Sequence, residues 1–88
     1  MTPQHQPQAQ RLTLPTTPIS VLDYMLAEGQ VTFTHTGVPA AYQGQGLAAL
    51  LVESGLQWAK AQGLKVVPAC SYVRIYIQRH PEWLPLLA

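Results

Sequence analysis

The stretch AYQGQGLAALL, residues Ala41–Leu51, places two glycines one residue apart directly before a run of alanine and leucine. Leu47, Leu50 and Leu51 recur at the spacing of one helix face, which predicts a long helix over residues 45–62. The first N–H groups of a helix have no intrahelical partner, and the helix dipole adds partial positive charge there. Two glycines at this point keep side chains away from those groups, so the turn is suited to a phosphate.

The segments before this helix have strand character. Residues 19–26 are apolar, β-branched and aromatic, and a Glu-Gly turn separates them from residues 30–36. The second segment alternates, with Val31, Phe33 and His35 expected on one face. Together the two segments predict a β-hairpin.

The segments after the helix complete the fold. Gly63 is suited to end the helix, residues 64–67 form a short apolar strand, and a second helix is expected over residues 72–79 with Ser71 as its N-cap. Pro81 opens a last turn. The order strand, helix, strand with short loops predicts a parallel βαβ crossover. The fold class is therefore α/β, with a mixed sheet built from the hairpin, the crossover and a C-terminal helix.

This topology brings distant residues together. The ends of the strands over residues 30–36 and 64–67 and the start of the long helix meet at one edge of the sheet, where ligands of open α/β sheets tend to bind. We therefore expect His35, the Gly44–Gly46 turn and Cys70 to be neighbours.

Composition limits the function classes. The net charge is +1 with five scattered Lys and Arg among 88 residues, which argues against a nucleic-acid or anionic-membrane partner. No apolar run is long enough to span a bilayer. The single cysteine excludes an internal disulfide, no Cys/His spacing fits a metal, and both features favour a cytoplasmic protein. The exposed edges of so small a sheet leave a homodimer open.

The chain is expected to divide near Pro18. Residues 1–18 are rich in proline and glutamine and are expected to be a flexible tail, with Arg11–Leu14 available as an edge strand. Residues 19–88 form the domain.

Several readings of the glycine turn remain open. A P-loop would need Lys and Ser or Thr after the second glycine, where Leu47 and Ala48 stand. The dinucleotide fingerprint matches through Ala49, but the turn does not directly follow a strand and no acidic residue follows residues 64–67. A tight packing turn without a ligand explains the glycines equally well at this level.

A third phosphate motif extends beyond the turn. The pattern Q/R-x-x-G-x-G/A matches at both glycines, with Ala41 at its first position. The stretches HTGVP, GQGLA..LV, GLKVVPACSYV and YIQRHPEW, within residues 22–87, closely resemble the small single-domain subgroup of the GCN5-related N-acetyltransferases (GNAT). The resemblance implies a minimal GNAT-like fold that keeps little more than the part that binds coenzyme A.

The resemblance also implies a cofactor and a site. The cofactor would be acetyl-CoA, and the reaction would be acetyl transfer to an amine acceptor, either a small molecule or a peptide. The coenzyme-binding residues carried over from the family are Val38, Gln43, Gly44, Gln45, Gly46, Leu47 and Ala48. His35 and Cys70 would line the place of the acetyl group.

Three side chains are candidates for the chemistry. His35 could take the amine proton, because an unperturbed histidine side chain titrates near neutrality, although a packed histidine is an alternative. Cys70 precedes a helix and could be a nucleophile, although an inert core cysteine is an alternative. Tyr72 could protonate the departing thiolate; it is preferred to Tyr76 because it lies nearer the strand end, and packing is the alternative for both.

Three functions remain open from sequence. The chain could be an N-acetyltransferase, a coenzyme A-binding module without catalysis, or a protein-interaction domain that recruits a partner through its N-terminal tail.

Overall fold

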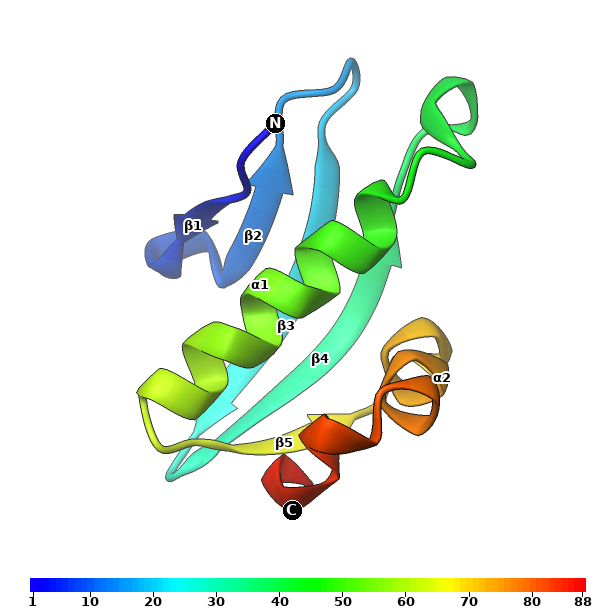
Figure 1. The fold of residues 1–88 in the computed structure, drawn as a ribbon. Coiled ribbons are helices and arrows are strands. Elements are labelled where there is room, and N and C mark those ends of the chain that lie inside the picture. The colour runs from blue at the N-terminus through cyan, green and yellow to red at the C-terminus, as the bar shows by residue number, and fades with distance from the viewer.

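The computed structural model describes residues 1–88, and its centre is a five-stranded sheet in the order β1-β2-β3-β4-β5. The strands are β1 (Gln4–Gln6), β2 (Arg11–Leu14), β3 (Ser20–Ala27), β4 (Gln30–Gly37) and β5 (Lys65–Pro68). The helices are α1 (Leu47–Ala61) and α2 (Ser71–Arg79), with short 3-10 turns η1 (Pro7–Ala9), η2 (Ala40–Tyr42) and η3 (Pro81–Leu86). α1 crosses one face of the sheet, and α2 and η3 lie at its β5 end (Figure 1).

The hairpin and the crossover are confirmed. β3 and β4 pair antiparallel, and β4 pairs in parallel with β5 after the chain has passed through α1. The first three strand pairs are antiparallel and the last is parallel, so the predicted mixed α/β sheet is correct. The ends of β4 and β5 and the start of α1 therefore lie on one side of the molecule (Figure 1).

The helix ends agree with the glycine signals, with one correction. Gly46 precedes α1 with φ of 75°, and Gly63 follows it with φ of 69° and an N–H bond to the Lys60 carbonyl. Ser71, predicted as the N-cap of α2, is instead its first helical residue. Cys70 occupies the cap because its N–H donates to the Phe33 carbonyl at 2.9 Å, which keeps Cys70 extended beside β4.

The N-terminal segment is not the expected flexible tail, but the strand offered over Arg11–Leu14 is confirmed as β2, with β1 rather than β2 at the edge of the sheet. β2 pairs with β3 from Arg11 opposite Asp23 to Leu14 opposite Ser20, and β1 pairs with β2. Leu12 and Leu14 are buried in the main core. The high proline and glutamine content suggests flexibility, but burial of Leu12 and Leu14 beneath α1 is enough to hold the segment in the sheet.

The core contains sixteen buried residues, contributed by the sheet, by α1 and by α2 with η3. Gly55 of α1 permits the closest approach, since a Cβ there would lie 2.8 Å from a Leu22 methyl carbon and 3.2 Å from the Phe33 ring. The two α-helices are short of the length and apolar character that crossing a bilayer needs.

Gly55→Ala should destabilise the protein. Ala favours a helix over Gly, but its methyl group would overlap buried Leu22 and Phe33, and overpacking costs about 1–3 kcal/mol. Urea unfolding should show a lower midpoint, while Ser54→Ala, one position earlier, should change stability by less than about 0.5 kcal/mol. Equal midpoints in both variants would contradict the close packing of α1 on the sheet.

His5 ties β1 to the domain. Its Nε2 lies 2.5 Å from the Tyr24 hydroxyl, and its ring meets Trp58 of α1 edge-on at 4.6 Å between centroids. Burial lowers the pKa of His5 below its ordinary value. The folded protein therefore favours neutral His5 more than the unfolded chain does.

Stability should depend on the charge of His5. Its contribution is complete above about pH 6.5 and declines as the pH falls toward the lower pKa of the folded state, because the unfolded chain then binds more protons. Urea unfolding at about pH 7.5 and about pH 5.5 should show a smaller loss for His5→Gln than for the unchanged protein. Equal losses would assign the acid sensitivity to other groups.

Candidate functional site

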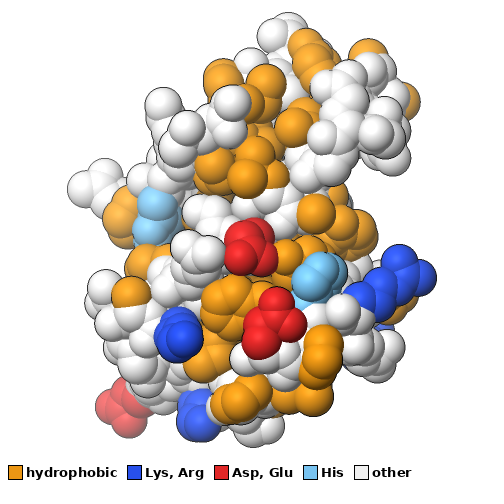
Figure 2. All heavy atoms as spheres, viewed as in Figure 1, with side chains coloured by type: hydrophobic (Ala, Val, Ile, Leu, Met, Phe, Trp, Pro, Cys, Tyr) orange, Lys and Arg blue, Asp and Glu red, His pale blue; other side chains and the backbone are white.

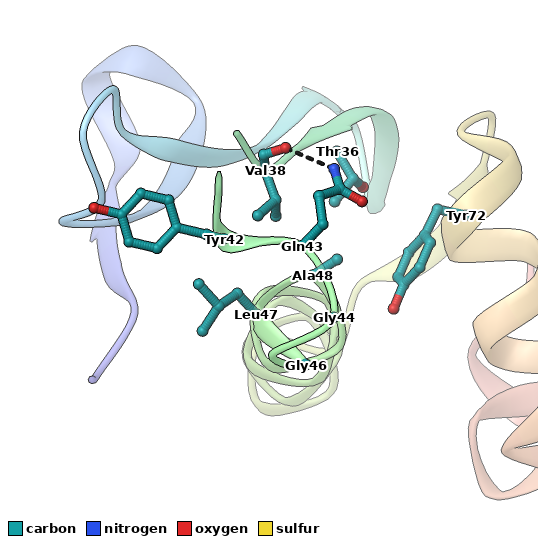
Figure 3. Close-up of a pocket in the computed structure, with 9 residues that line it drawn as sticks. All are labelled: Thr36, Val38, Tyr42, Gln43, Gly44, Gly46, Leu47, Ala48 and Tyr72. Atoms are coloured by element: carbon teal, nitrogen blue, oxygen red, sulfur yellow. Dashed lines mark hydrogen bonds between the residues drawn. The ribbon is translucent and has the colours of Figure 1, made fainter. Parts of the chain in front are cut away.

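A pocket of about 340 Å³ opens where β4 ends and α1 begins. Its wall is completed by η2 on one side and by the first turn of α2 on the other (Figure 3). The lining residues are Thr36, Val38, Tyr42, Gln43, Gly44, Gly46, Leu47, Ala48 and Tyr72. The pocket occupies the sheet edge where the topology predicts a ligand site.

Most residues carried over for the coenzyme line this pocket. Val38, Gln43, both glycines of the turn, Leu47 and Ala48 are among its lining residues, whereas Gln45 is exposed and outside the lining. Thr36 and Tyr42 also line it and were missed by the sequence analysis. Tyr42 lies two residues before Gly44, within the phosphate motif, so its position was a usable signal.

The loop before α1 presents backbone N–H groups without acceptors. The first bond of the α1 ladder runs from the Leu50 N–H to the Gly46 carbonyl, and none of the N–H groups from Gly44 to Ala49 donates within the molecule. Gln43 holds the loop in place, since its side-chain amide donates to the Val38 carbonyl at 2.9 Å (Figure 3). Six consecutive unsatisfied donors (44, 45, 46, 47, 48, 49) at the positive end of a helix can hold an anion.

The glycines leave room for that anion. Gly44 and Gly46 have φ of 81° and 75°, and a Cβ on either would meet nothing within 4 Å. There is no charged side chain from Thr36 to Val52. On the face seen in Figure 2, Lys and Arg side chains are separated from one another and none surrounds the loop. An anion would therefore be bound by the backbone.

A β-bulge decides which side chains reach the pocket. The register between β3 and β4 shifts so that Asp23 faces His35 but Tyr24 faces Phe33, which leaves Thr34 as an extra residue. The expected placement of His35 on the Val31 and Phe33 face is therefore wrong. The shift turns the exposed His35 to the open face of the sheet and turns Thr36, opposite buried Leu22, toward the pocket.

Cys70 lies behind the pocket wall and contacts Thr36. The Thr36 hydroxyl oxygen and the Cys70 sulfur are 3.4 Å apart. Burial disfavours the thiolate, but hydrogen bonds from the Thr36 hydroxyl and from the Val73, Tyr72 and Thr36 backbone outweigh burial and lower the pKa of Cys70. Cys70 is thus more readily ionised than an ordinary cysteine.

The two tyrosines of α2 have different surroundings. Tyr72 lines the pocket and is 40% exposed. The Tyr76 hydroxyl donates a hydrogen bond to the Glu53 carboxylate of α1, and the Tyr76 ring stacks on His80. Burial, together with the nearby Glu53 carboxylate, raises the pKa of Tyr76. Tyr72 is therefore the tyrosine available to a bound molecule. Of the three predicted neighbours, the glycine turn and Cys70 lie on either side of Thr36, whereas His35 faces the other side of the sheet.

The chain was compared with known proteins. A family model described as GCN5-related N-acetyl-transferase matches residues 11–86. The protein is similar to Protein NATD1 of Gallus gallus and of Mus musculus, each 35% identical over 51 residues, which is 58% of this chain and 46% of the relative. For Protein NATD1 of Homo sapiens the identity is 35% over 51 residues, 58% of this chain and 45% of the relative. The matched stretch thus spans about half the length of these curated relatives.

The N–H groups of the loop should exchange rapidly with solvent deuterium. Those from Gly44 to Ala49 have no acceptor, whereas buried Leu51 and Leu56 belong to the hydrogen-bonded interior of α1. Amide exchange followed residue by residue by NMR should separate the two groups sharply. Slow exchange at Leu47 to Ala49 would mean that another group already occupies these donors.

Proposed function

Because the chain belongs to the GCN5-related N-acetyltransferase family, we propose that it transfers the acetyl group of acetyl-CoA to an amine acceptor. One observation carries the proposal: the unpaired N–H groups from Gly44 to Ala49 adjoin a pocket that leads to Thr36 and Tyr72. A diphosphate with an acyl-carrying arm needs both features.

The residues fit coenzyme A in two parts. The loop N–H groups would hold the diphosphate, since the glycines offer open space and no carboxylate stands in the first turn of α1. Val38, Leu47 and Ala48 offer apolar walls for the arm. Val38 and the loop keep their relative position through the bond from Gln43.

Transfer requires a neutral amine and a proton for the departing thiolate. Bound acetyl-CoA would supply the activated acetyl group. Tyr72 is our candidate for the proton donor, because it lines the pocket, whereas the Tyr76 hydroxyl is already engaged with Glu53. Cys70 is our candidate for the nucleophile of a two-step route. His35 faces the open side of the sheet, away from the pocket, so we assign the amine proton to water.

The two alternative functions, a non-catalytic coenzyme-binding module and a protein-interaction domain, would require different properties of the protein. A coenzyme-binding module would bind acetyl-CoA without turning it over in the presence of any amine. An interaction domain would need a segment free to recruit a partner, but Gln4–Gln6 and Arg11–Leu14 are paired in the sheet. The paired strands favour the acetyltransferase over recruitment by a tail.

Gly46→Ala should weaken coenzyme binding strongly. Its methyl group would enter the open space in front of the N–H groups, and alanine at φ of 75° adds strain of about 1–2 kcal/mol. Calorimetric titration with acetyl-CoA should show an affinity at least about tenfold weaker than for the unchanged protein. Pantetheine, which lacks the diphosphate, should bind weakly to both proteins.

Gly63→Ala is the matched control. Gly63 has φ of 69° and equally open surroundings but lies at the far end of α1, so the same strain arises without an effect on the loop. Retained binding in Gly63→Ala with loss in Gly46→Ala supports the assignment. Equal binding in the two variants would refute the placement of the diphosphate, and binding with no acetylated product from any of a panel of amines would favour the non-catalytic module.

A further inference from the structure

Cys70 is attached to β4 at two points. Its backbone N–H donates to the Phe33 carbonyl at 2.9 Å, and its sulfur lies 3.4 Å from the Thr36 hydroxyl. Phe33 is the last residue of β4 that pairs with β5, so the second contact spans the place where the two strands have parted. The sulfur is therefore held against Thr36, a residue that lines the pocket, although Cys70 itself is not among the lining residues.

Thr36 reaches the sulfur because of the β-bulge. With regular alternation from Phe33, Thr36 would point to the open face of the sheet, and the extra residue Thr34 reverses this. A threonine side chain is restricted at χ1, so its hydroxyl has few alternative directions. One side of Thr36 lines the pocket while its hydroxyl meets Cys70.

We propose that Thr36 is a positioning residue that holds the Cys70 sulfur beside the pocket, so that Cys70 receives the acetyl group before the amine does. The proposal rests on the proposed acetyltransferase function. It selects the two-step route over direct transfer, and it assigns Thr36 a role that no residue pattern in the sequence indicates.

Acetyl transfer through Cys70 takes two steps. The ionised Cys70 sulfur attacks the thioester carbonyl, a carbon–sulfur bond to Cys70 forms, and the bond to the coenzyme sulfur breaks. The departing thiolate takes a proton from the Tyr72 hydroxyl or from water. The neutral amine then attacks the acetyl group on Cys70, the new carbon–nitrogen bond forms, and Cys70 leaves as thiolate while the amine proton passes to water.

The local chemistry favours an ionised sulfur. Burial opposes ionisation, but the Thr36 hydroxyl and the N–H groups at the start of α2 donate toward the sulfur and lower the pKa of Cys70. The helix N-terminus adds its dipole in the same sense. Removing the Thr36 hydroxyl should therefore weaken both the hold on the sulfur and its ionisation.

The test uses the single cysteine of the chain as its own reporter. The rate of iodoacetamide alkylation is measured against pH in the unliganded protein and in Thr36→Val, Thr36→Ser and Thr34→Val. We expect Thr36→Val to be alkylated about tenfold more slowly at pH 7, with its pH profile moved upward, and Thr36→Ser to resemble the unchanged protein. Thr34→Val, the same change at a position that contacts the Asp23 carbonyl instead, should leave the profile unchanged.

A second measurement follows the acetyl group. After brief incubation with acetyl-CoA and no amine, mass spectrometry of peptides should find acetyl on Cys70 in the unchanged protein and Thr36→Ser, and at least about fivefold less in Thr36→Val, as expected when a thiolate loses a hydrogen bond. Thr36→Ala replaces Thr36→Val if the latter does not fold. Unchanged alkylation in the variant without the hydroxyl, or amine acetylation that persists in Cys70→Ala, overturns the proposal.

The failure of this proposal is distinguishable from failure of the proposed function. If the unchanged protein does not bind acetyl-CoA in calorimetry, the acetyltransferase assignment fails, and this proposal fails with it. If it binds acetyl-CoA and acetylates an amine while the alkylation profiles of all variants coincide, only the role of Thr36 fails.

Discussion

The parallel pairing of β4 with β5 ends after Phe33 and Pro68, and the architecture of the site depends on this ending. Beyond Pro68 the chain turns, and the Cys70 N–H takes the Phe33 carbonyl that a longer strand would have used. The rest of β4 is unpaired on that side, so Thr36, and Val38 just beyond the strand, can line a pocket. A longer β5 would close the space between the two strands.

The middle of α1 is packed tightly against the sheet, whereas the N–H groups at its N-terminus have no hydrogen-bond acceptors. An N-cap side chain would stabilise the helix by about 1 kcal/mol, yet Gly46 offers none. The loss is offset by burial, since Leu51, Leu56 and Ala59 are fully buried and Gly55 lets the helix approach the sheet closely. The N–H groups that lack a cap are those that could bind an anion, so a helix fixed by its packing retains donors for a ligand.

The β-bulge assigns the two sides of β4 to different surroundings. It places Thr36 beside Cys70 and the pocket, and it places His35 opposite Asp23 on the open face. Gly37 accommodates this arrangement, because a Cβ there would lie 3.0 Å from the His35 ring nitrogen. Without the extra residue, regular alternation would have placed His35 on the pocket side of β4 and Thr36 on the open face.

The amino-acid sequence by itself determined the hairpin, the long helix, the crossover and the sheet edge at which the glycine turn lies, and the resemblance in its motifs identified the family. These features were predictable because hydrophobic periodicity, turn glycines and short connections act over a few neighbouring residues. Only the tertiary structure decided the places of His35 and Thr36, the burial of Leu12 and Leu14 in a sheet that β1 extends beyond β2, and the cap of α2 at Cys70. Each of these depends on contacts between segments far apart in the chain: a bulge is defined against its partner strand, β2 is stable only where α1 covers its leucines, and Cys70 is held by a carbonyl of β4.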